Sequence, residues 1–243
     1  MKTVAKKLAL RLLPESVLHL VKKIHYARVV RSISPNDEPD LKVIQRLVAP
    51  GHHVADLGAN IGVYTKYLSG LVGTSGRVHS VEPIPLTFDI LRSNVRKLGL
   101  RNVELKNCAI SDTDGYVTME VPRFDWGGEN FYGARIVSGQ AKHSFRRTTV
   151  PCYTVDTLFS ELESPIHFIK CDVEGHELSC LRGAARTIQS SKPAWLIEIS
   201  NTPGDEKSTS YQTFCLLRES RYEAYWFDGA KLASSFGSYA QPL

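Results

Sequence analysis

From Val54 onward, short apolar runs alternate with stretches of helical periodicity, and no other feature of the sequence constrains the fold as strongly. Strands that alternate with helices pair in parallel, because each helix carries the chain back across one face of the sheet. We therefore expect an α/β fold, a mostly parallel sheet with helices on both faces. Six runs read as strands: residues 54–57, 78–82, 103–110, 166–171, 194–199 and 222–227.

One stretch breaks this alternation between the third and the fourth expected strand. Residues 116–121 and 147–153 read as extended segments, and they flank a run rich in glycine and aromatic side chains. We interpret residues 113–152 as an inserted β-hairpin or lid. The enclosing domain is expected to cover residues 49–243, with residues 1–48 as an N-terminal amphipathic helical extension.

The glycine and aromatic run reads F-D-W-G-G-E-N-F-Y-G and is a candidate contact for an acceptor molecule. Aromatic rings offer flat apolar surfaces that can stack on a sugar ring or an apolar compound. The candidates for substrate binding are Trp126, Asn130, Phe131 and Tyr132. Packing at an ordinary hairpin tip explains the same residues equally well.

The net charge of +5 is concentrated in the N-terminal segment. Residues 1–31 contain eight Lys and Arg side chains against Glu15 alone, so the rest of the chain is close to neutral. A near-neutral body argues against nucleic acid as a partner. Apolar residues at helical spacing in the same segment leave two interpretations: a helical cap packed on the domain, or peripheral contact with an anionic membrane.

The cysteines indicate a reducing compartment. Their number is odd, they are scattered, and no C-x-x-C pair is present to clamp zinc or exchange disulfides. The chain, with 243 residues, is long enough for one large domain with its own core. We therefore expect a folded cytoplasmic protein with reduced thiols.

The most informative local motif is D-L-G-A-N-I-G, residues 56–62, where the first strand gives way to a helix. Its glycines allow a tight turn and a close approach of the backbone to a ligand. Asn60 stands where a dinucleotide fingerprint has its second glycine, so a pyrophosphate is not favoured. Glu82 ends the next strand, where a carboxylate can accept both hydroxyls of a ribose. Together these residues predict a site for an adenosyl cofactor.

Several runs resemble the FkbM family of S-adenosylmethionine-dependent methyltransferases. They are D-L-G-A-N-I-G-V-Y-T, V-E-P-I-P, I-K-C-D-V-E-G-H-E, L-R-G-A and W-L-I-E-I, in family order over about residues 50–200. The resemblance implies a class I methyltransferase fold, which is Rossmann-like, with the cofactor over the carboxyl ends of the first three strands. It also implies an O-methyltransferase acting on a hydroxyl of a saccharide or a secondary metabolite.

The resemblance assigns residues to S-adenosylmethionine by position. Glu82 would hold the ribose, and Ala109 and Ile110 would wall the adenine, with Cys108 equally placed by spacing. The residues expected around or near the methionine part are Asp56, Gly58, Asn60, Gly62 and Thr65.

Ionisable side chains gather where the fourth and fifth strands end. Asp172, Glu174 and His176 follow the fourth strand, and Glu198 lies near the end of the fifth. Neighbouring strands lie about 4.8 Å apart, so Asp172 and Glu198 should open onto one edge. Methyl transfer to an alcohol needs a base for the hydroxyl proton. We expect Asp172 to position the sulfonium or the substrate, Glu174 or His176 to act as base, and Glu198 to anchor the substrate.

Alternatives remain at the levels of chemistry and of function. A Mg²⁺ ion held by these carboxylates could lower the pKa of the alcohol directly. Glu174 could instead only complement the positive end of the following helix. In place of a methyltransferase for small molecules or glycans, the chain could be a non-catalytic S-adenosylmethionine-binding scaffold or an RNA methyltransferase.

Overall fold

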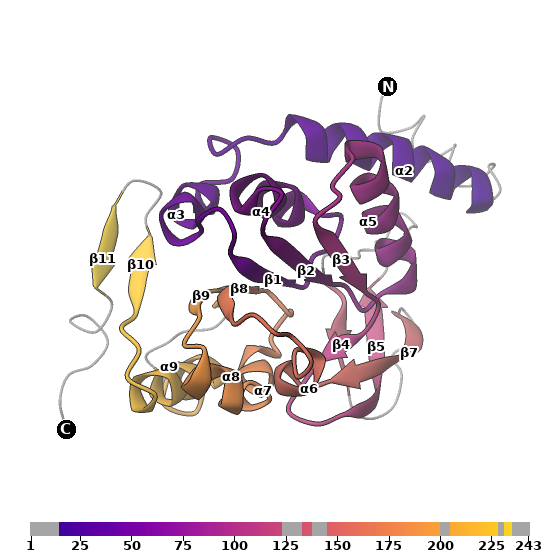
Figure 1. Cartoon of the computed structure of the whole chain (residues 1–243). Coiled ribbons are helices and arrows are strands. Elements are labelled where there is room, and N and C mark those ends of the chain that lie inside the picture. The colour runs from indigo at the N-terminus through magenta and orange to yellow at the C-terminus, as the bar shows by residue number, and fades with distance from the viewer. Residues whose placement is uncertain (1–14, 123–132, 138–144, 200–204, 228–230, 235–243) are drawn as a thin grey trace.

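The computed structural model describes residues 15–122, 133–137, 145–199, 205–227 and 231–234 (Figure 1). At its centre is a parallel sheet of five strands in the order β3-β2-β1-β8-β9. The chain builds outward from β1 to β3 and then crosses to β8, so β1 and β8 flank the switch point where such sheets bind ligands. In sheet order the strands are Val103–Lys106, Arg77–Val81, His53–Leu57, Ile166–Cys171 and Ala194–Ile197.

Helices cover both faces of this sheet, as parallel strands require. On one face, Val54 and Phe168 pack with residues of α3 and α4; on the other, Leu57 and Ile169 pack with residues of α6 to α9. The expected α/β sheet with helices on both faces is confirmed. The helices after the N-terminal one are α3 Asp40–Leu47, α4 Val63–Val72, α5 Pro85–Leu98, α6 Val155–Leu158, α7 Glu177–Arg182, α8 Ala185–Ser190 and α9 Thr209–Glu219.

The inserted segment contributes to a second sheet, with the strand order β4-β7-β5-β6. β5 and β7 pair antiparallel along the whole of β5, which confirms the expected inserted β-hairpin. Buried Met119 and Val150 pack with Ile84, which follows the end of β2, so the second sheet lies against the main one. Its strands are β4 Ala109–Ile110, β5 Gly115–Pro122, β6 Arg135–Ile136 and β7 Phe145–Tyr153.

The strand expected at residues 103–110 is in fact two strands. β3 pairs with β2, whereas β4 leaves the parallel sheet and pairs with β7. At the break, the Asn107 Nδ2 donates to the carbonyl oxygens of Glu82 (2.8 Å) and Pro83 (3.0 Å). These bonds hold the chain at the end of β2 while its backbone turns away. The prediction of one continuous strand was therefore wrong.

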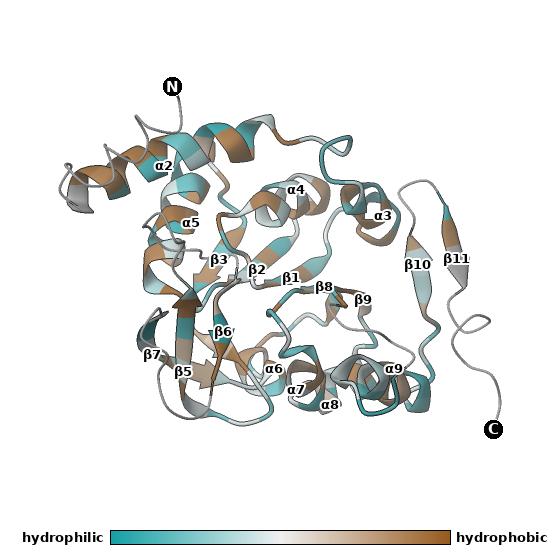
Figure 2. Cartoon of the chain, turned by 180° about the vertical axis from the view of Figure 1, so that it is seen from behind, coloured by the Kyte–Doolittle hydropathy of each residue, from teal (hydrophilic) through white to brown (hydrophobic). Residues whose placement is uncertain are grey.

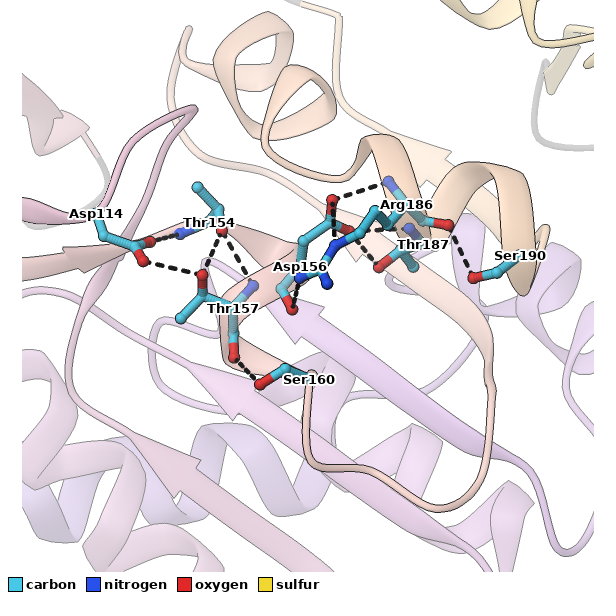
Figure 3. Close-up of polar contacts among 8 residues, drawn as sticks. All are labelled: Asp114, Thr154, Asp156, Thr157, Ser160, Arg186, Thr187 and Ser190. Atoms are coloured by element: carbon cyan, nitrogen blue, oxygen red, sulfur yellow. Dashed lines mark hydrogen bonds and ion pairs between the residues drawn. The ribbon is translucent and has the colours of Figure 1, made fainter.

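Side-chain hydrogen bonds attach the second sheet to helices of the main domain (Figure 3). Asp114, just before β5, accepts from the Thr154 backbone N–H at 2.7 Å and from the Thr157 hydroxyl at 2.9 Å. Asp156 of α6 accepts the backbone N–H groups of Arg186 and Thr187 at 2.8 Å, at the start of α8. The described part of the insertion is thus bonded to the start of α6, and α6 is in turn bonded to the start of α8.

The sixth expected strand, residues 222–227, does not join the parallel sheet in the described part of the chain. β10 (Tyr225–Phe227) pairs antiparallel with β11 (Leu232–Ser234) instead. Tyr225 and Trp226 are 57% and 61% exposed, so β10 lacks the two-sided burial of a strand inside a parallel sheet. The prediction of a further strand in that sheet was wrong for these residues.

The N-terminal helix α2 (Glu15–Ser32) lies along α5 (Figures 1 and 2). Val30 packs with Ile90 of α5, and the Lys23 ammonium lies 2.5 Å from a carboxylate oxygen of Asp89. Helix α2 thus lies within the expected extension of residues 1–48, and one of its faces is packed on α5. In the ranges described, no helix combines the length and the apolar character needed to cross a membrane.

Candidate active site

The turn between β1 and α4 brings the ends of three strands together. The N–H groups of Gly58 and Ala59 both donate to the Val81 carbonyl oxygen at the end of β2, at 3.0 and 2.9 Å. Gly58 has a φ of 80°, and a β-carbon there would lie 1.8 Å from the Asp172 carbonyl oxygen, which follows β8. Only glycine fits this position, because any side chain would collide with the backbone of β8.

Glu82 follows β2 and faces this turn. Its Oε2 accepts the Asn60 backbone N–H at 3.0 Å, and its Oε1 accepts the Ile84 backbone N–H at 2.9 Å. The residue is 5% exposed. Burial raises the pKa of Glu82 to about 7, although the two N–H donors oppose that shift. The position that the sequence assigned to a ribose therefore carries a buried, anchored carboxyl group.

A cavity opens to solvent beside Glu82, and the empty space in it and in its mouth is about 560 Å³. Gly58 and Asn60 border it, as expected from their place in the turn. The apolar wall next to Glu82 is formed by Ile84, Cys108, Ala109 and Ile110.

The second sheet and the end of β8 complete the cavity. Met119 of β5 and Ile136 of β6 line it, and so do Asp172 and Glu174. The cavity therefore has an apolar wall from the insertion and an acidic wall from the carboxyl end of the parallel sheet. The sequence did not predict these apolar lining residues of the insertion; it predicted substrate contacts in the aromatic run of residues 124–133 instead.

Three residues expected near the methionine part of a cofactor lie behind the turn. Asp56 is fully buried, and its Oδ2 accepts the Thr65 hydroxyl at 2.6 Å. The Thr65 hydroxyl also lies 2.9 Å from the Ser80 hydroxyl, and burial raises the pKa of Asp56. Gly62, with a φ of 94°, precedes α4. Asp56, Gly62 and Thr65 do not line the cavity; they hold the turn that does.

Asp172 and Glu198 lie together, as the strand order predicts. The Asp172 N–H donates to the Leu57 carbonyl at 3.1 Å, and the Glu198 N–H donates to the Cys171 carbonyl at 3.0 Å. Their carboxyl groups share a hydrogen bond, which together with burial raises the pKa of Glu198 to about 7. A carboxylate can accept a hydrogen bond from a hydroxyl group, and a protonated carboxyl group can donate one to it.

Lys170 is the important neighbour that sequence reasoning missed. Its ammonium lies 2.7 Å from Asp172 Oδ2 and 4.6 Å from the centre of the Tyr64 ring. Burial disfavours the charge, but Asp56 and Asp172 outweigh it and raise the pKa of Lys170, so the side chain remains an ammonium ion. The signal was present, because a lysine inside the apolar strand I-H-F-I-K-C needs a charged partner.

Glu174 and His176 separate in the structure. Glu174 lines the cavity, and burial and the neighbouring Asp172 carboxylate raise its pKa. His176 does not line it; its Nε2 lies 2.8 Å from the Ser111 hydroxyl, and burial lowers its pKa. Glu177 supports the loop, because its Oε1 accepts the Gly175 backbone N–H at 3.0 Å. Of the two expected bases, only Glu174 faces the space where a substrate could bind.

Two further expectations concern the insertion and a metal. Trp126, Asn130, Phe131 and Tyr132 lie outside the described residues. Within those residues, no group of three or more His, Cys, Asp or Glu side chains is arranged to hold a metal ion. The Lys170 ammonium lies against one of the two carboxylate oxygens of Asp172.

Short local similarity links the chain to curated methyltransferases. A protein-L-isoaspartate O-methyltransferase from Aeropyrum pernix is 43% identical over 54 residues, 22% of this chain and 21% of that protein. Its counterpart from Methanopyrus kandleri is 42% identical over 50 residues, 21% of this chain and 22% of that protein. The chain thus matches only about a fifth of the length of these relatives.

Similarity to solved structures extends over most of the chain. A methyltransferase FkbM from Methylobacillus flagellatus KT has a TM-score of 0.50 and 17% identity, with 85% of this chain and 55% of that one covered. An O-methyltransferase from Bacillus cereus in complex with SAH also has a TM-score of 0.50, at 16% identity, covering 92% of this chain and 89% of that one. These similarities confirm the class I methyltransferase fold.

The family model of the methyltransferase FkbM domain matches residues 56–224. The match begins at the end of β1 and contains Glu82, Asp172, Glu174 and Glu198, so it covers both walls of the cavity. It also spans well over half of the sequence and confirms the resemblance read from the motifs. The chain belongs to the FkbM family of methyltransferases.

Proposed function

We propose that the protein is an S-adenosylmethionine-dependent O-methyltransferase that methylates a hydroxyl group of a saccharide or a secondary metabolite. The observation that carries the proposal is that Glu82, Asp172 and Glu174 line one cavity. Glu82, whose carboxyl group can accept hydrogen bonds from ribose hydroxyls, thus faces the same space as Asp172 and Glu174, whose carboxyl groups can accept the proton of a hydroxyl. Membership of the FkbM family supports methyl transfer as the reaction.

The residues beside Glu82 fit S-adenosylmethionine. Each Glu82 oxygen accepts one backbone N–H and keeps a further lone pair for a ribose hydroxyl. Ile84 and Ala109 offer apolar contacts for adenine, and Asn60 borders the side assigned to the methionine part. When bound, the cofactor supplies a methyl group bonded to a cationic sulfur. Transfer of the methyl group breaks this carbon–sulfur bond and leaves the sulfur as a neutral thioether.

Glu174 is the proposed base. It takes the proton of the acceptor hydroxyl while an oxygen lone pair forms the new bond to the methyl carbon. The raised pKa of Glu174 supports this role, since a base works best when its pKa lies near the working pH. His176 is less suited, because its ring is engaged by the Ser111 hydroxyl away from the cavity.

Asp172 and Glu198 are assigned to the acceptor. Asp172 orients the hydroxyl from the cavity wall, and Glu198 anchors it through the carboxyl pair. Lys170 is a positioning residue, because it acts by holding Asp172 Oδ2. With an ammonium ion already at that oxygen, we expect transfer to continue after treatment with EDTA. Loss of transfer that Mg²⁺ restores would instead support the metal alternative.

Transfer of a labelled methyl group from S-adenosylmethionine tests the function. The acceptors are fractionated glycan and metabolite extracts, an isoaspartyl peptide and total RNA. We expect label in a glycan or metabolite fraction, loss of that label with Glu174→Gln, and no change with Glu163→Gln, which alters an exposed carboxylate. Label only in RNA or in the peptide would contradict the acceptor class, and cofactor binding without any transfer would favour the scaffold alternative.

A further inference from the structure

Helix α2 carries apolar side chains on two different faces. The inner face packs against α5 and the turn after β1, where Tyr26 and Val29 surround the buried Val30. The outer face carries a second apolar set with 40–56% of each residue exposed: Val17, Leu20, Val21 and Ile24. We call this set the α2 stripe. It follows the helical spacing of one continuous face, so it is a contiguous surface rather than scattered exposure.

The same outer face becomes basic toward the end of the helix. Arg28 and Arg31 follow the α2 stripe at helical spacing, and both are exposed. Together with Lys97 of α5, they line a hollow that also includes Ile24 and Ala27. Among the residues that the structure describes, no acidic side chain lines this hollow. An apolar patch therefore adjoins a small cationic recess on one surface of the molecule.

Nearby acidic groups do not neutralise this recess. Asp89 of α5 faces α2, but its carboxylate is already in contact with Lys23 and Arg92. The N-terminal 31 residues hold eight basic side chains against one acidic one, while the remaining chain sums to slightly negative. An occupant of this surface must therefore supply negative charge and apolar area together.

We propose that the outer face of α2 docks the protein on an anionic lipid bilayer. The α2 stripe enters the boundary between headgroups and acyl chains, and Arg28, Arg31 and Lys97 contact the phosphate headgroups. A nucleic acid would match the charge, but it offers nothing apolar for four aliphatic side chains that cannot stack on bases. A second copy of the same helix would bring like charges together.

Sedimentation of the full chain with vesicles tests the proposal. We expect the protein to pellet with vesicles of phosphatidylserine and phosphatidylcholine in equal parts, and to remain in solution with phosphatidylcholine alone. Arg28→Gln combined with Arg31→Gln should lower the partition coefficient about twenty-fivefold, given about fivefold for each charge near an anionic surface. Raised salt should weaken the binding in the same direction.

A second variant tests the apolar part. Leu20→Ser combined with Val21→Ser and Ile24→Ser alters only exposed side chains, so the fold should persist. We expect it to reduce vesicle binding at least tenfold, because each aliphatic side chain gains free energy when it leaves water. Trp226→Ser and Arg101→Gln are the matched controls, since both change exposed residues outside α2, and neither should alter the partition.

Three results would overturn the proposal. The first is failure of the wild-type chain to pellet with anionic vesicles, and the second is equal binding by the wild type and both α2 variants. The third is a dimer in sedimentation equilibrium that the Leu20→Ser combination dissociates, because a second copy would then cover the stripe. Binding of S-adenosylhomocysteine by the same variants shows that they are folded, and it reports on the cofactor site independently of the membrane.

Discussion

The two ends of the cavity are built in different ways. At the end proposed for the cofactor, backbone N–H groups hold the two oxygens of Glu82, and the turn is fixed by a glycine that no other residue can replace. At the acceptor end, Asp172, Glu198 and Lys170 hold one another through side chains. The first end has a geometry set by the main chain, whereas the geometry of the second depends on side chains. Protonation does not separate the two ends, because the pKa values of Glu82 and Glu198 are both raised to about 7.

This difference separates binding from chemistry. A carboxyl group anchored by the backbone keeps its position whatever its neighbours do, which suits recognition of a constant cofactor. A carboxyl group such as Glu198, whose pKa is raised to about 7, can take up or release a proton near neutral pH, which suits work on a hydroxyl. Changes at the two ends should therefore have different signatures, in affinity at one end and in turnover at the other.

The largest effect is expected from Gly58→Ala, which disturbs both ends. The new methyl group would meet the backbone after β8, at a residue with positive φ, so the variant should lose about 3 kcal/mol or more of unfolding free energy. Gly99→Ala is the matched control, because it has a similar φ of 68° with nothing within 4 Å, and should lose only about 1 kcal/mol. Urea denaturation measures both; equal losses would show that the contact between the turn and β8 is unimportant.

Asp172→Asn should affect turnover and not the cofactor. The neutral amide cannot form the ion pair with Lys170, and Glu198 loses the carboxylate to which it is hydrogen-bonded. We expect kcat to fall about a hundredfold, in the range of lost acid–base catalysis. Affinity for S-adenosylhomocysteine should change less than a few fold. A parallel loss of affinity would mean that the two ends are not separable.

The pH dependence of stability should report on Glu82. Its pKa is about 7 in the folded protein against 4.5 ordinarily, so the folded state holds this proton more tightly than the unfolded state. The unfolding free energy should therefore fall as pH rises from 4.5 to about 7, by on the order of 2 kcal/mol from this group. Glu198 shifts in the same direction. Urea titrations at several pH values should show a flatter profile for Glu82→Gln, and an unchanged profile would contradict the assignment.

A smaller effect is expected from Lys170→Met. The Lys170 ammonium lowers the pKa values of Glu174 and Glu198, so its removal should raise both. The acidic limb of the pH–rate profile should then move upward by about one pH unit, a tenfold change in rate on that limb. Lys42→Met, at an exposed position of α3, is the control. A purely structural lysine would lower the rate without moving the limb.

Sequence reasoning succeeded where the signal was local or followed from strand order. The turn with Gly58 and Asn60 is readable from its residues, and so is the place of Glu82 after the second strand. Asp172 and Glu198 were expected together because neighbouring parallel strands end at the same edge. The structure places Asp172 directly after β8 and Glu198 directly after β9, the two strands that the pattern predicts.

Sequence reasoning failed where contacts between residues far apart in the sequence determine the local structure. Nothing in the pattern of residues 103–110 shows that Asn107 will bond to carbonyl groups at the end of β2 and turn the strand away. Nor does the motif show that the Asp56 side chain bonds to Thr65 of α4 and does not line the cavity, because the face of a strand is set by packing. The pair of Lys170 with Asp172 is local, but the approach of Asp56 to Lys170 depends on the register between β1 and β8, which places these two residues opposite each other.

Calorimetric titration of S-adenosylhomocysteine into the wild type, Glu82→Gln and Glu174→Gln tests the division of the cavity most directly. We expect the wild type and Glu174→Gln to bind with the same affinity. Glu82→Gln should bind about tenfold to a hundredfold more weakly, because hydrogen bonds to a charged carboxylate are lost. Equal affinity of Glu82→Gln and the wild type would contradict the placement of the cofactor beside Glu82.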